Sequence, residues 1–501
     1  MKQTFDCYIK TVSPVHIGCD EVYEPTGFVI DKNAKQLIAF DPFEFFQSLE
    51  DQEIDKFSKI CRKGTIESII EIYKFFENKQ AQGKHVDVCE GFLENYKKTL
   101  QLANEKNRGK IGNELNSFTI HRTAFNTIDQ RPYIPGSSIK GSLRTAYLNY
   151  LAGIKKVRTQ KGRDAAGKLE ESLLSGSFAS DPFRLVKVSD FMPVGDVKTR
   201  IIYAVNKKKK PSKYESSGPP QIIEVIQTGA AFKGKITVEK AHDSIPSIKK
   251  EDQIRFSILL NSAEQFYNTE KTKENNIFKK LGIPENEIFK EENSYPIRIG
   301  KHCGAESITI EGYRSITIRR GGKEKPLTNQ NKTTTIWLAA NNRKPKNTNR
   351  LAPFGWAELA EINNDLKEEF SRHEAEWKKT EKLKKEELQN QQIKKQKEEE
   401  ARQKLAIERQ KKEDEEKKLK EELEKMSPEQ RAVAELKSPS IIENRAVEIY
   451  KNIENYQQDY QKTVAKGLKN YWIAKNKWEK KKCTKKQFLK VQTIKEILGE
   501  I

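Results

Sequence analysis

One stretch of this 501-residue chain is strongly constrained to be helical. Residues 365–426 contain neither Gly nor Pro and consist mostly of Glu, Lys and Gln. Acidic and basic side chains recur four positions apart, as at Glu374 and Lys378, a spacing that stabilises an isolated helix by about 0.2–0.5 kcal/mol per pair. Large apolar residues are sparse and keep no heptad over three repeats. We therefore expect a solitary charged helix that acts as a spacer, with a coiled-coil dimer or partial disorder as alternatives.

This helix divides the chain into three predicted parts: residues 1–364, the spacer 365–426, and a basic helical unit at 427–501. Ser427 followed by Pro428 is a helix start signal, and apolar residues resume after it. The last part contains Trp472 and Trp478 close to many lysines. Aromatic side chains among lysines can stack on bases, or they can be core residues with solvated neighbours. No partner for this unit can be named from its sequence.

Charge and composition favour a nucleic-acid partner. The chain carries 93 Lys and Arg against 72 Asp and Glu, a formal net charge of +21, which argues for a polyanion such as RNA or DNA. No apolar run is long enough for a membrane span, and the first residues lack the apolar run of a signal peptide. The six cysteines are scattered without a CxxC pair, which disfavours disulfides and zinc. We expect a cytoplasmic protein without a metal or cofactor.

The first 364 residues alternate short strands with a few helices, which predicts an α+β fold. Residues 28–31 and 36–40 are expected to form a hairpin, and residues 51–116 a polar helical insertion. Residues 222–227 and 232–238 are expected to pair with each other around Thr228-Gly229, and residues 254–261 to form a further strand.

The stretch from Pro132 to Leu151 has the composition of a phosphate site. Pro132 and Pro135 favour an extended backbone before the helix. Gly136, Ser137 and Ser138 then permit a turn, and either serine can cap a helix. Lys140 and Arg144 follow, four residues apart in the first two helical turns. Free amides, hydroxyls and cations at a helix start suit a phosphate. The P-loop spacing is absent, however, and a capped amphipathic helix with solvated cations is the alternative.

A second candidate region is a glycine loop in residues 295–319. Gly300 and Gly304 flank Lys301 and His302, with Arg298 before the loop and Arg314 after it. Glycines beside cations let the backbone approach a sugar–phosphate chain closely. A hairpin turn that needs glycine is the competing interpretation.

Four motifs in order resemble those of the RAMP superfamily of CRISPR RNA-binding proteins. PGSSIKGSLRTA at 135–146 resembles the superfamily signature, and TVSPVHIG at 11–18 its first-strand motif. DPFRLVKVSD at 181–190 is similar to the strand after the signature helix, and PFGWAEL at 353–359 to the closing glycine-containing loop. The set is most similar to the fifth subunit of the type III-A Csm effector complex, over roughly residues 1–360.

The resemblance implies a ferredoxin-like or RRM-like core with long insertions. It also implies a non-catalytic subunit that grips the 3′ portion of the guide RNA (crRNA), with target RNA nearby, and caps a filament of related RAMP subunits, supporting crRNA maturation and antiviral defence. Residues beyond the closing motif depart from the family pattern. The residues implied for RNA contact are Gly136, Ser137, Ser138, Lys140, Gly141, Arg144, His16, Arg122, Arg298, Gly300, Lys301 and Arg314.

The alternative is a RAMP-family endoribonuclease that processes or cleaves RNA. Of the six histidines (His16, His85, His121, His242, His302 and His373), His16, His121 and His302 fall in or beside the motifs and are candidate acids or bases. Asp129 lies near the place of the cleavage aspartate of related backbone subunits, but its surroundings do not match, and a turn-forming role is the alternative. No spacing supports a metal site.

Overall fold

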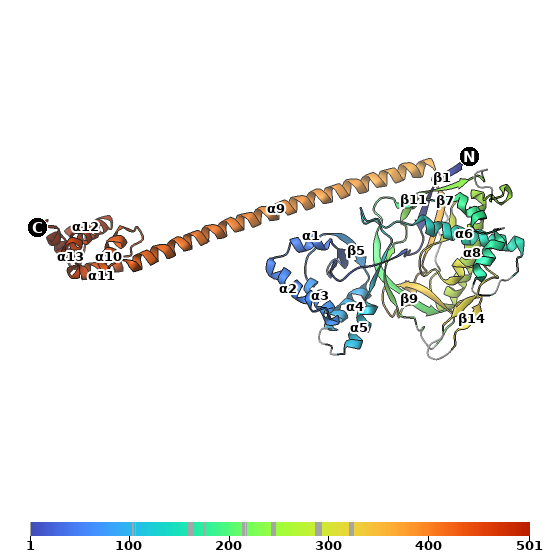
Figure 1. Ribbon diagram of the computed structural model, residues 1–501, viewed down its shortest axis with the longest axis horizontal. Coiled ribbons are helices and arrows are strands. Elements are labelled where there is room, and N and C mark those ends of the chain that lie inside the picture. The colour runs from blue at the N-terminus through green and yellow to red at the C-terminus, as the bar shows by residue number, and fades with distance from the viewer. Residues whose placement is uncertain are drawn as a thin grey trace. The chain divides into compact units, whose positions relative to one another are not determined.

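The computed structural model describes residues 2–102, 105, 107–158, 162, 164–174, 176–212, 216, 218–241, 247–285, 293–319 and 325–501. His242 lies outside this described part. The chain divides into two compact units, residues 1–381 and 382–501. The first unit is a mixed α+β body with two sheets, and the second is helical (Figure 1).

The first sheet is antiparallel, with the strand order β12-β16-β1-β11-β7 and β8 also paired to β11. Its strands are β1 (Lys2–Thr11), β7 (Val186–Val188), β8 (Met192–Pro193), β11 (Ala231–Glu239), β12 (Tyr295–Arg298) and β16 (Trp356–Glu361). Helices α6 (Gly136–Lys155) and α8 (Phe256–Leu281) pack together, and the Ser142 hydroxyl donates to the Tyr267 hydroxyl at 2.9 Å. Both helices share one apolar core with the sheet, which therefore holds α6 in place.

The second sheet is mixed, with the order β2-β6-β10-β9-β5-β4-β3 and β15 paired to β9. Its strands are β2 (Gly18–Val22), β3 (Phe28–Asp31), β4 (Gln36–Ala39), β5 (Lys84–Val88), β6 (Ile120–Thr123), β9 (Thr199–Lys208), β10 (Gln221–Ile226) and β15 (Thr335–Ala340). It has a core of its own, which includes Leu37, Val86 and Ile223. A separate ribbon pairs β13 (Ile316–Ile318) with β14 (Leu327–Gln330).

The insertion is helical as expected, apart from β5. Its helices are α2 (Asp51–Arg62), α3 (Ile66–Phe76), α4 (Glu90–Gln101) and α5 (Arg108–Ser117). α1 (Pro42–Gln47) precedes the insertion, and α7 (Ala165–Leu173) follows α6. The hairpin of β3 and β4 is confirmed, since Ile30 pairs with Leu37.

Two strand predictions are wrong. Residues 254–261 run into α8, where Leu259, Ala263 and Phe266 are buried at helical spacing, because a short apolar run suits a buried helix as well as a strand. β10 and β11 do not pair with each other, since they belong to different sheets. Thr11 holds the connection between them: its carbonyl accepts from the Gly229 amide at 2.7 Å, and its hydroxyl from the Ala230 amide at 2.9 Å.

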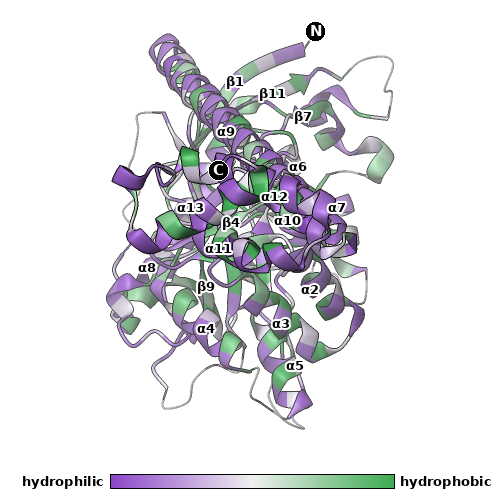
Figure 2. Ribbon diagram, turned by 90° about the vertical axis from the view of Figure 1, so that its left-hand side faces the viewer, coloured by the Kyte–Doolittle hydropathy of each residue, from purple (hydrophilic) through white to green (hydrophobic). Residues whose placement is uncertain are grey.

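The long charged helix is present as α9 (Asn364–Lys425), and Figure 2 shows it as hydrophilic along most of its length. Its first turns belong to the first unit, where Phe370 is buried in a small cluster with Tyr8 and Val194. None of the described helices combines the length and apolarity that a membrane crossing needs.

The second unit ends in four helices: α10 (Pro428–Lys437), α11 (Glu443–Asn452), α12 (Gln458–Ala474) and α13 (Lys485–Leu498). Ser427 forms a capping box with Gln430, which confirms the start signal. Trp472 is fully buried at the centre of an apolar core, so it is a core residue rather than a base-stacking one.

Candidate nucleic-acid interface

The signature helix begins two or three residues earlier than a cap at Ser137 or Ser138 would place it. α6 begins at Gly136 with Pro135 as its N-cap and without a side-chain cap, so the expectation that a serine caps it is wrong. The Gly136 amide donates to the Asp190 carboxylate at 2.8 Å, and the Ser138 amide to the Pro135 carbonyl at 2.9 Å. The protein itself therefore supplies acceptors for these two amides of the predicted phosphate cradle.

The two glycines of the signature have different surroundings. Gly136 is buried against β7, and a Cβ there would lie 2.3 Å from the Val188 carbonyl oxygen. Gly141 is exposed, and a Cβ there would meet nothing within 4 Å. Packing against β7 thus requires the first glycine, whereas the packing of this chain alone does not require the second.

Arg144 is engaged inside the protein. Its guanidinium donates to Glu170 at 2.7 Å and to Asp181 at 2.8 Å, and it lies over the Phe183 ring at 5.1 Å. These contacts fasten the segment after α6 to the helix. Arg144 is only half-exposed, so its main visible role is to fix the surface around Lys140.

Lys140 shares its surroundings with another cation. Burial lowers the pKa of the Lys140 ammonium, and the nearby Lys187 ammonium on β7 lowers it further, while Asp181 opposes the shift. Ser137, Gly141 and Lys187 are exposed, and Lys140 is half-buried. We call these four residues the α6 face. It offers two cations and a hydroxyl beside Gly141, where no side chain covers the backbone of the helix.

The glycine loop packs against the first-strand motif. Gly300 has φ of +87°, and a Cβ there would lie 2.4 Å from the His16 carbonyl oxygen. The Lys301 amide donates to that same carbonyl at 2.8 Å. The Lys301 side chain covers Gly18, and its ammonium lies 3.4 Å from the Asp20 carboxylate with half of the side chain exposed. The loop therefore presents Lys301 at the surface.

The three motif histidines gather around this loop. His16 is buried and donates from Nδ1 to the Glu224 carbonyl at 2.7 Å, and its ring centroid lies 6.1 Å from that of His302. Burial lowers the pKa of both side chains to about 4, and Lys301 adds to the effect. The pKa of His121, which is less buried, is also lowered by burial and by Lys301. We call His16, His121, Lys301 and His302 the junction cluster.

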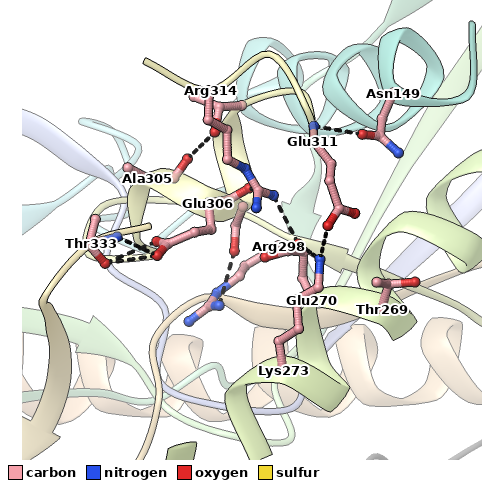
Figure 3. Close-up of polar contacts among 12 residues, drawn as sticks. Asn149, Thr269, Glu270, Lys273, Arg298, Ala305, Glu306, Glu311, Arg314 and Thr333 are labelled. Carbon is pink, nitrogen blue, oxygen red and sulfur yellow. Dashed lines mark hydrogen bonds and ion pairs between the residues drawn. The ribbon is translucent and has the colours of Figure 1, made fainter. Parts of the chain in front are cut away.

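Arg298 and Arg314 make their polar contacts within the protein, and Figure 3 shows Arg314 directed towards Glu270. Arg298 donates to the Glu274 carboxylate at 2.7 Å and to the Ser307 hydroxyl at 3.0 Å. Arg314 donates to Glu270 at 2.9 Å. Both side chains are only 4% exposed, so they cannot reach a phosphate in this conformation, and the expected RNA track through them needs correction.

Two further predicted residues are largely occupied by neighbours. Arg122 lies between the rings of Tyr23 and Phe125, with its guanidinium carbon 4.7 and 3.5 Å from their centroids. The Asp129 carboxylate accepts from the backbone and side chain of Arg131 at 3.1 and 2.9 Å, which is the turn-forming role.

Sequence reasoning missed the acidic partners of the signature helix. Asp181 and Asp190 are both in the DPFRLVKVSD motif, and they contact Arg144 and Gly136. Lys187 comes from the same motif. The signal was the motif itself, but only the packing of β7 beside α6 shows what its charged residues contact. Across the described ranges, no three His, Cys, Asp or Glu side chains are placed to hold a metal ion.

Comparisons with known proteins agree with these motifs. The family model described as the RAMP superfamily matches residues 8–473. A curated relative, the CRISPR system Cms protein Csm5 of Methanocaldococcus jannaschii, is 25% identical over 407 residues, which cover 71% of this chain and 88% of that protein.

Two solved structures are also similar. One is a chain of the cryo-EM structure of a Csm-crRNA-target RNA ternary complex of a type III-A CRISPR-Cas system, with 18% identity, 71% of this chain and 100% of that chain covered, and a TM-score of 0.44. The other is the crystal structure of T. onnurineus Csm5, with 16% identity, 70% and 99% coverage, and a TM-score of 0.39.

Proposed function

This chain belongs to the RAMP superfamily, and on that premise we propose that it is a non-catalytic RNA-binding subunit of a type III-A CRISPR effector complex, of the Csm5 kind. It would hold the 3′ portion of the crRNA, lie near target RNA and cap a filament of related RAMP subunits. The curated Csm5 relative and the net charge of +21 both support this assignment.

The α6 face is the observation that carries the proposal. Burial is the main cause of the lowered pKa of Lys140, and the nearby Lys187 ammonium lowers it further, so the two cations repel each other. A phosphate placed between them would relieve this repulsion and accept from the exposed Ser137 hydroxyl. Gly141 leaves the helix backbone open to a close approach. The face therefore suits a phosphodiester backbone better than a neutral ligand.

The strand order supports the ferredoxin-like core that the family resemblance implies. In chain order, β1, α6, β7, β11, α8 and β16 alternate as two strand–helix–strand units. In space, the strands lie in the order β16-β1-β11-β7 and are all antiparallel, with α6 and α8 packed together. In this arrangement the signature helix begins beside β7, so the signature motif at 135–146 and the motif at 181–190 lie next to each other.

The proposed division of roles follows burial. Ser137, Lys140, Gly141, Lys187 and Lys301 would contact phosphates. The other predicted residues would shape that surface: Gly136, Ser138, Arg144, Gly300, Arg122, His16, Arg298 and Arg314.

The test is RNA binding by the full chain and by a Lys140→Gln/Lys187→Gln variant over a salt series, with the integrity of the RNA monitored. Two lost phosphate contacts should weaken binding and reduce the slope of log affinity against log salt by about 1.4. Lys97→Gln/Lys98→Gln, on the exposed side of α4, changes the same charge elsewhere and is the control. Unchanged binding by the α6-face variant would reject this site.

The junction cluster is the observation that favours the second candidate, an endoribonuclease. Metal-independent cleavage needs a base within hydrogen-bond reach of the 2′-hydroxyl. His16 is buried and already donates to Glu224, so His121 is the more accessible histidine of the cluster. Cleavage by nuclease-free wild-type protein in a chelator that stops with His121→Asn would replace the non-catalytic proposal.

A further inference from the structure

In the second unit, positive and negative side chains are concentrated in different segments. The proposed function of the first unit does not involve these positive side chains. Residues 427–501 contain sixteen Lys and Arg against nine Asp and Glu. Between Lys462 and Lys495 there are twelve lysines and a single acid, Glu479. Six of the nine acids lie earlier, between Glu429 and Asp459. The positive charge is therefore concentrated on α12, α13 and the segment that joins them.

The spacer helix shows that this concentration is not a general property of the chain. Residues 364–425, which form α9, contain nineteen basic and nineteen acidic residues, so their net charge is zero. Alternating charges of both signs are therefore enough to keep α9 soluble, without an excess of either sign. An excess of one sign in the helices that follow creates an attractive field for an anionic partner.

The fold of the unit brings these lysines together. On α12, Lys462, Lys466 and Lys469 are four and three residues apart and share one side of the helix, away from the buried residues Val464 and Leu468. α12 packs against α13, and residues 475–486, which are the connection between them and the first two residues of α13, contribute seven lysines. The three α12 lysines and residues 475–486 follow one another in the chain, and the helices that carry them pack around one small apolar core.

Most of these lysines lack an acidic partner. Lys469 pairs with Glu500 at 2.5 Å, Lys482 with Glu479 at 3.1 Å, and Lys477 with Glu443. Residues 427–501 are all described, and within them nine of the twelve lysines have no carboxylate within ion-pair distance. These nine are Lys462, Lys466, Lys475, Lys480, Lys481, Lys485, Lys486, Lys490 and Lys495.

The aromatic residues indicate what such a surface can recognise. Trp472 is fully buried, so it cannot stack on a base. Trp478 is half-buried, with the ammonium groups of Lys469 and Lys495 at 5.6 and 5.9 Å from its ring centroid. Every aromatic residue between 462 and 495 is buried or half-buried, whereas most of the lysines are exposed, so contacts would go to phosphates rather than to base faces. Binding through phosphates is independent of sequence and sensitive to salt.

We propose that residues 462–495 form a second binding surface for a nucleic-acid phosphodiester backbone, separate from the α6 face. Nucleic acid fits best because its phosphates are evenly spaced negative charges. They can pair with a series of lysines that have no carboxylate nearby. A second phosphate-binding surface on one chain would also raise the overall affinity for a single strand by making its second contact intramolecular.

The experiment uses the full chain and a labelled single-stranded RNA of about 30 nucleotides without relation to a guide, between about 50 and 200 mM salt. The tail variant is Lys475→Gln/Lys481→Gln/Lys485→Gln/Lys486→Gln, four exposed lysines outside the ion pairs. The matched control removes the same charge from α9: Lys411→Gln/Lys412→Gln/Lys417→Gln/Lys418→Gln, also exposed. Circular dichroism checks that both variants keep their helices.

The tail variant should bind at least about tenfold more weakly at the low end of the salt range, with a slope reduced by up to about 2.8, while the control binds like wild type. Equal binding by the tail variant and the control would overturn the proposal. So would binding to anionic phospholipid vesicles that the tail lysines support while RNA and DNA binding is unaffected. Parallel titrations with duplex RNA, single-stranded DNA and duplex DNA then identify the strand that the surface prefers.

A combined variant separates this proposal from the function of the first unit. If both surfaces bind, Lys140→Gln/Lys187→Gln and the tail variant each lose part of the affinity, and their combination loses most of it. If only the tail variant weakens binding, the α6 face is rejected and the tail surface stands. If only the α6-face variant weakens binding, the tail surface is rejected.

Discussion

Arg298 and Glu274 form a buried ion pair at 2.7 Å, and the same carboxylate accepts from the Trp356 indole at 2.6 Å. The pair joins β12 to α8, and Trp356 adds β16. An arginine beside a glycine loop, which in the sequence is a candidate RNA contact, thus connects two strands of the first sheet to the helix that covers it.

Arg298→Ala should destabilise the first unit by about 3–5 kcal/mol, because it leaves the Glu274 carboxylate buried without its cation. Lys301→Ala, three residues away and half-exposed, should change stability by no more than about 0.5 kcal/mol. Urea unfolding followed by tryptophan fluorescence measures both. If Arg298→Ala is as stable as wild type and loses RNA affinity instead, the arginine belongs to the RNA track after all.

The two signature glycines should respond oppositely to alanine. Gly136→Ala places a Cβ 2.3 Å from the Val188 carbonyl and should destabilise the packing of α6 on β7. Gly141→Ala meets nothing within 4 Å and removes a helix-interior glycine, so it should stabilise by about 0.5–1 kcal/mol. Thermal unfolding tests both changes.

Gly141→Ala also tests the RNA proposal directly. If RNA passes close to the exposed helix backbone, the added methyl group should lower RNA affinity although the protein is more stable. An affinity equal to that of wild type would mean that the strand does not approach at Gly141. Thr145→Ala, one turn further along α6, provides a comparison at a half-exposed position.

The junction histidines should make the first unit less stable in mild acid. The pKa of His16 and of His302 is lowered by burial to about 4, whereas an unfolded histidine titrates near about 6.5. Between these values the unfolded chain binds protons that the folded chain does not. Stability is therefore full above about pH 6.5 and falls towards pH 4, with up to about 1.4 kcal/mol per pH unit from each histidine.

Urea unfolding at several pH values between about 4 and 7 measures this slope. His16→Asn keeps a donor near the Glu224 carbonyl but does not titrate in this window, so it should flatten the dependence. His85→Asn, at an exposed position on β5, is the control and should leave the slope unchanged. A slope unaffected by His16→Asn would mean that His16 keeps an ordinary pKa.

Truncation should show that the start of α9 belongs to the first unit. A chain ending at residue 381 keeps Phe370 against Tyr8 and keeps Glu374, which accepts from Arg131 at 3.2 Å and from the Gly195 amide at 3.1 Å. A chain ending at residue 364 loses these contacts and should be less stable by at least about 2 kcal/mol. Equal thermal stability of the two truncated chains would contradict the anchoring role.

Local patterns were sufficient for several elements. The absence of Gly and Pro predicted α9 to within one residue at either end, because helix propensity acts along neighbouring residues. The capping box at Ser427 and the hairpin of β3 and β4 are likewise short-range features. Periodicity did not decide residues 254–261, since a short apolar run fits either a buried strand or a helix.

The sequence by itself determined the α+β class, the charged helix, the basic C-terminal helices and the positions of the RAMP motifs, all of which depend on residues near one another in the chain. Only the tertiary structure decided that Arg298 and Arg314 turn inward while Lys187 joins Lys140 at the surface. A basic side chain can thus be a buried ion-pair partner, as Arg298 is, or an exposed cation, as Lys187 is. The difference lies in which carboxylates the fold brings within reach, and those carboxylates come from distant segments.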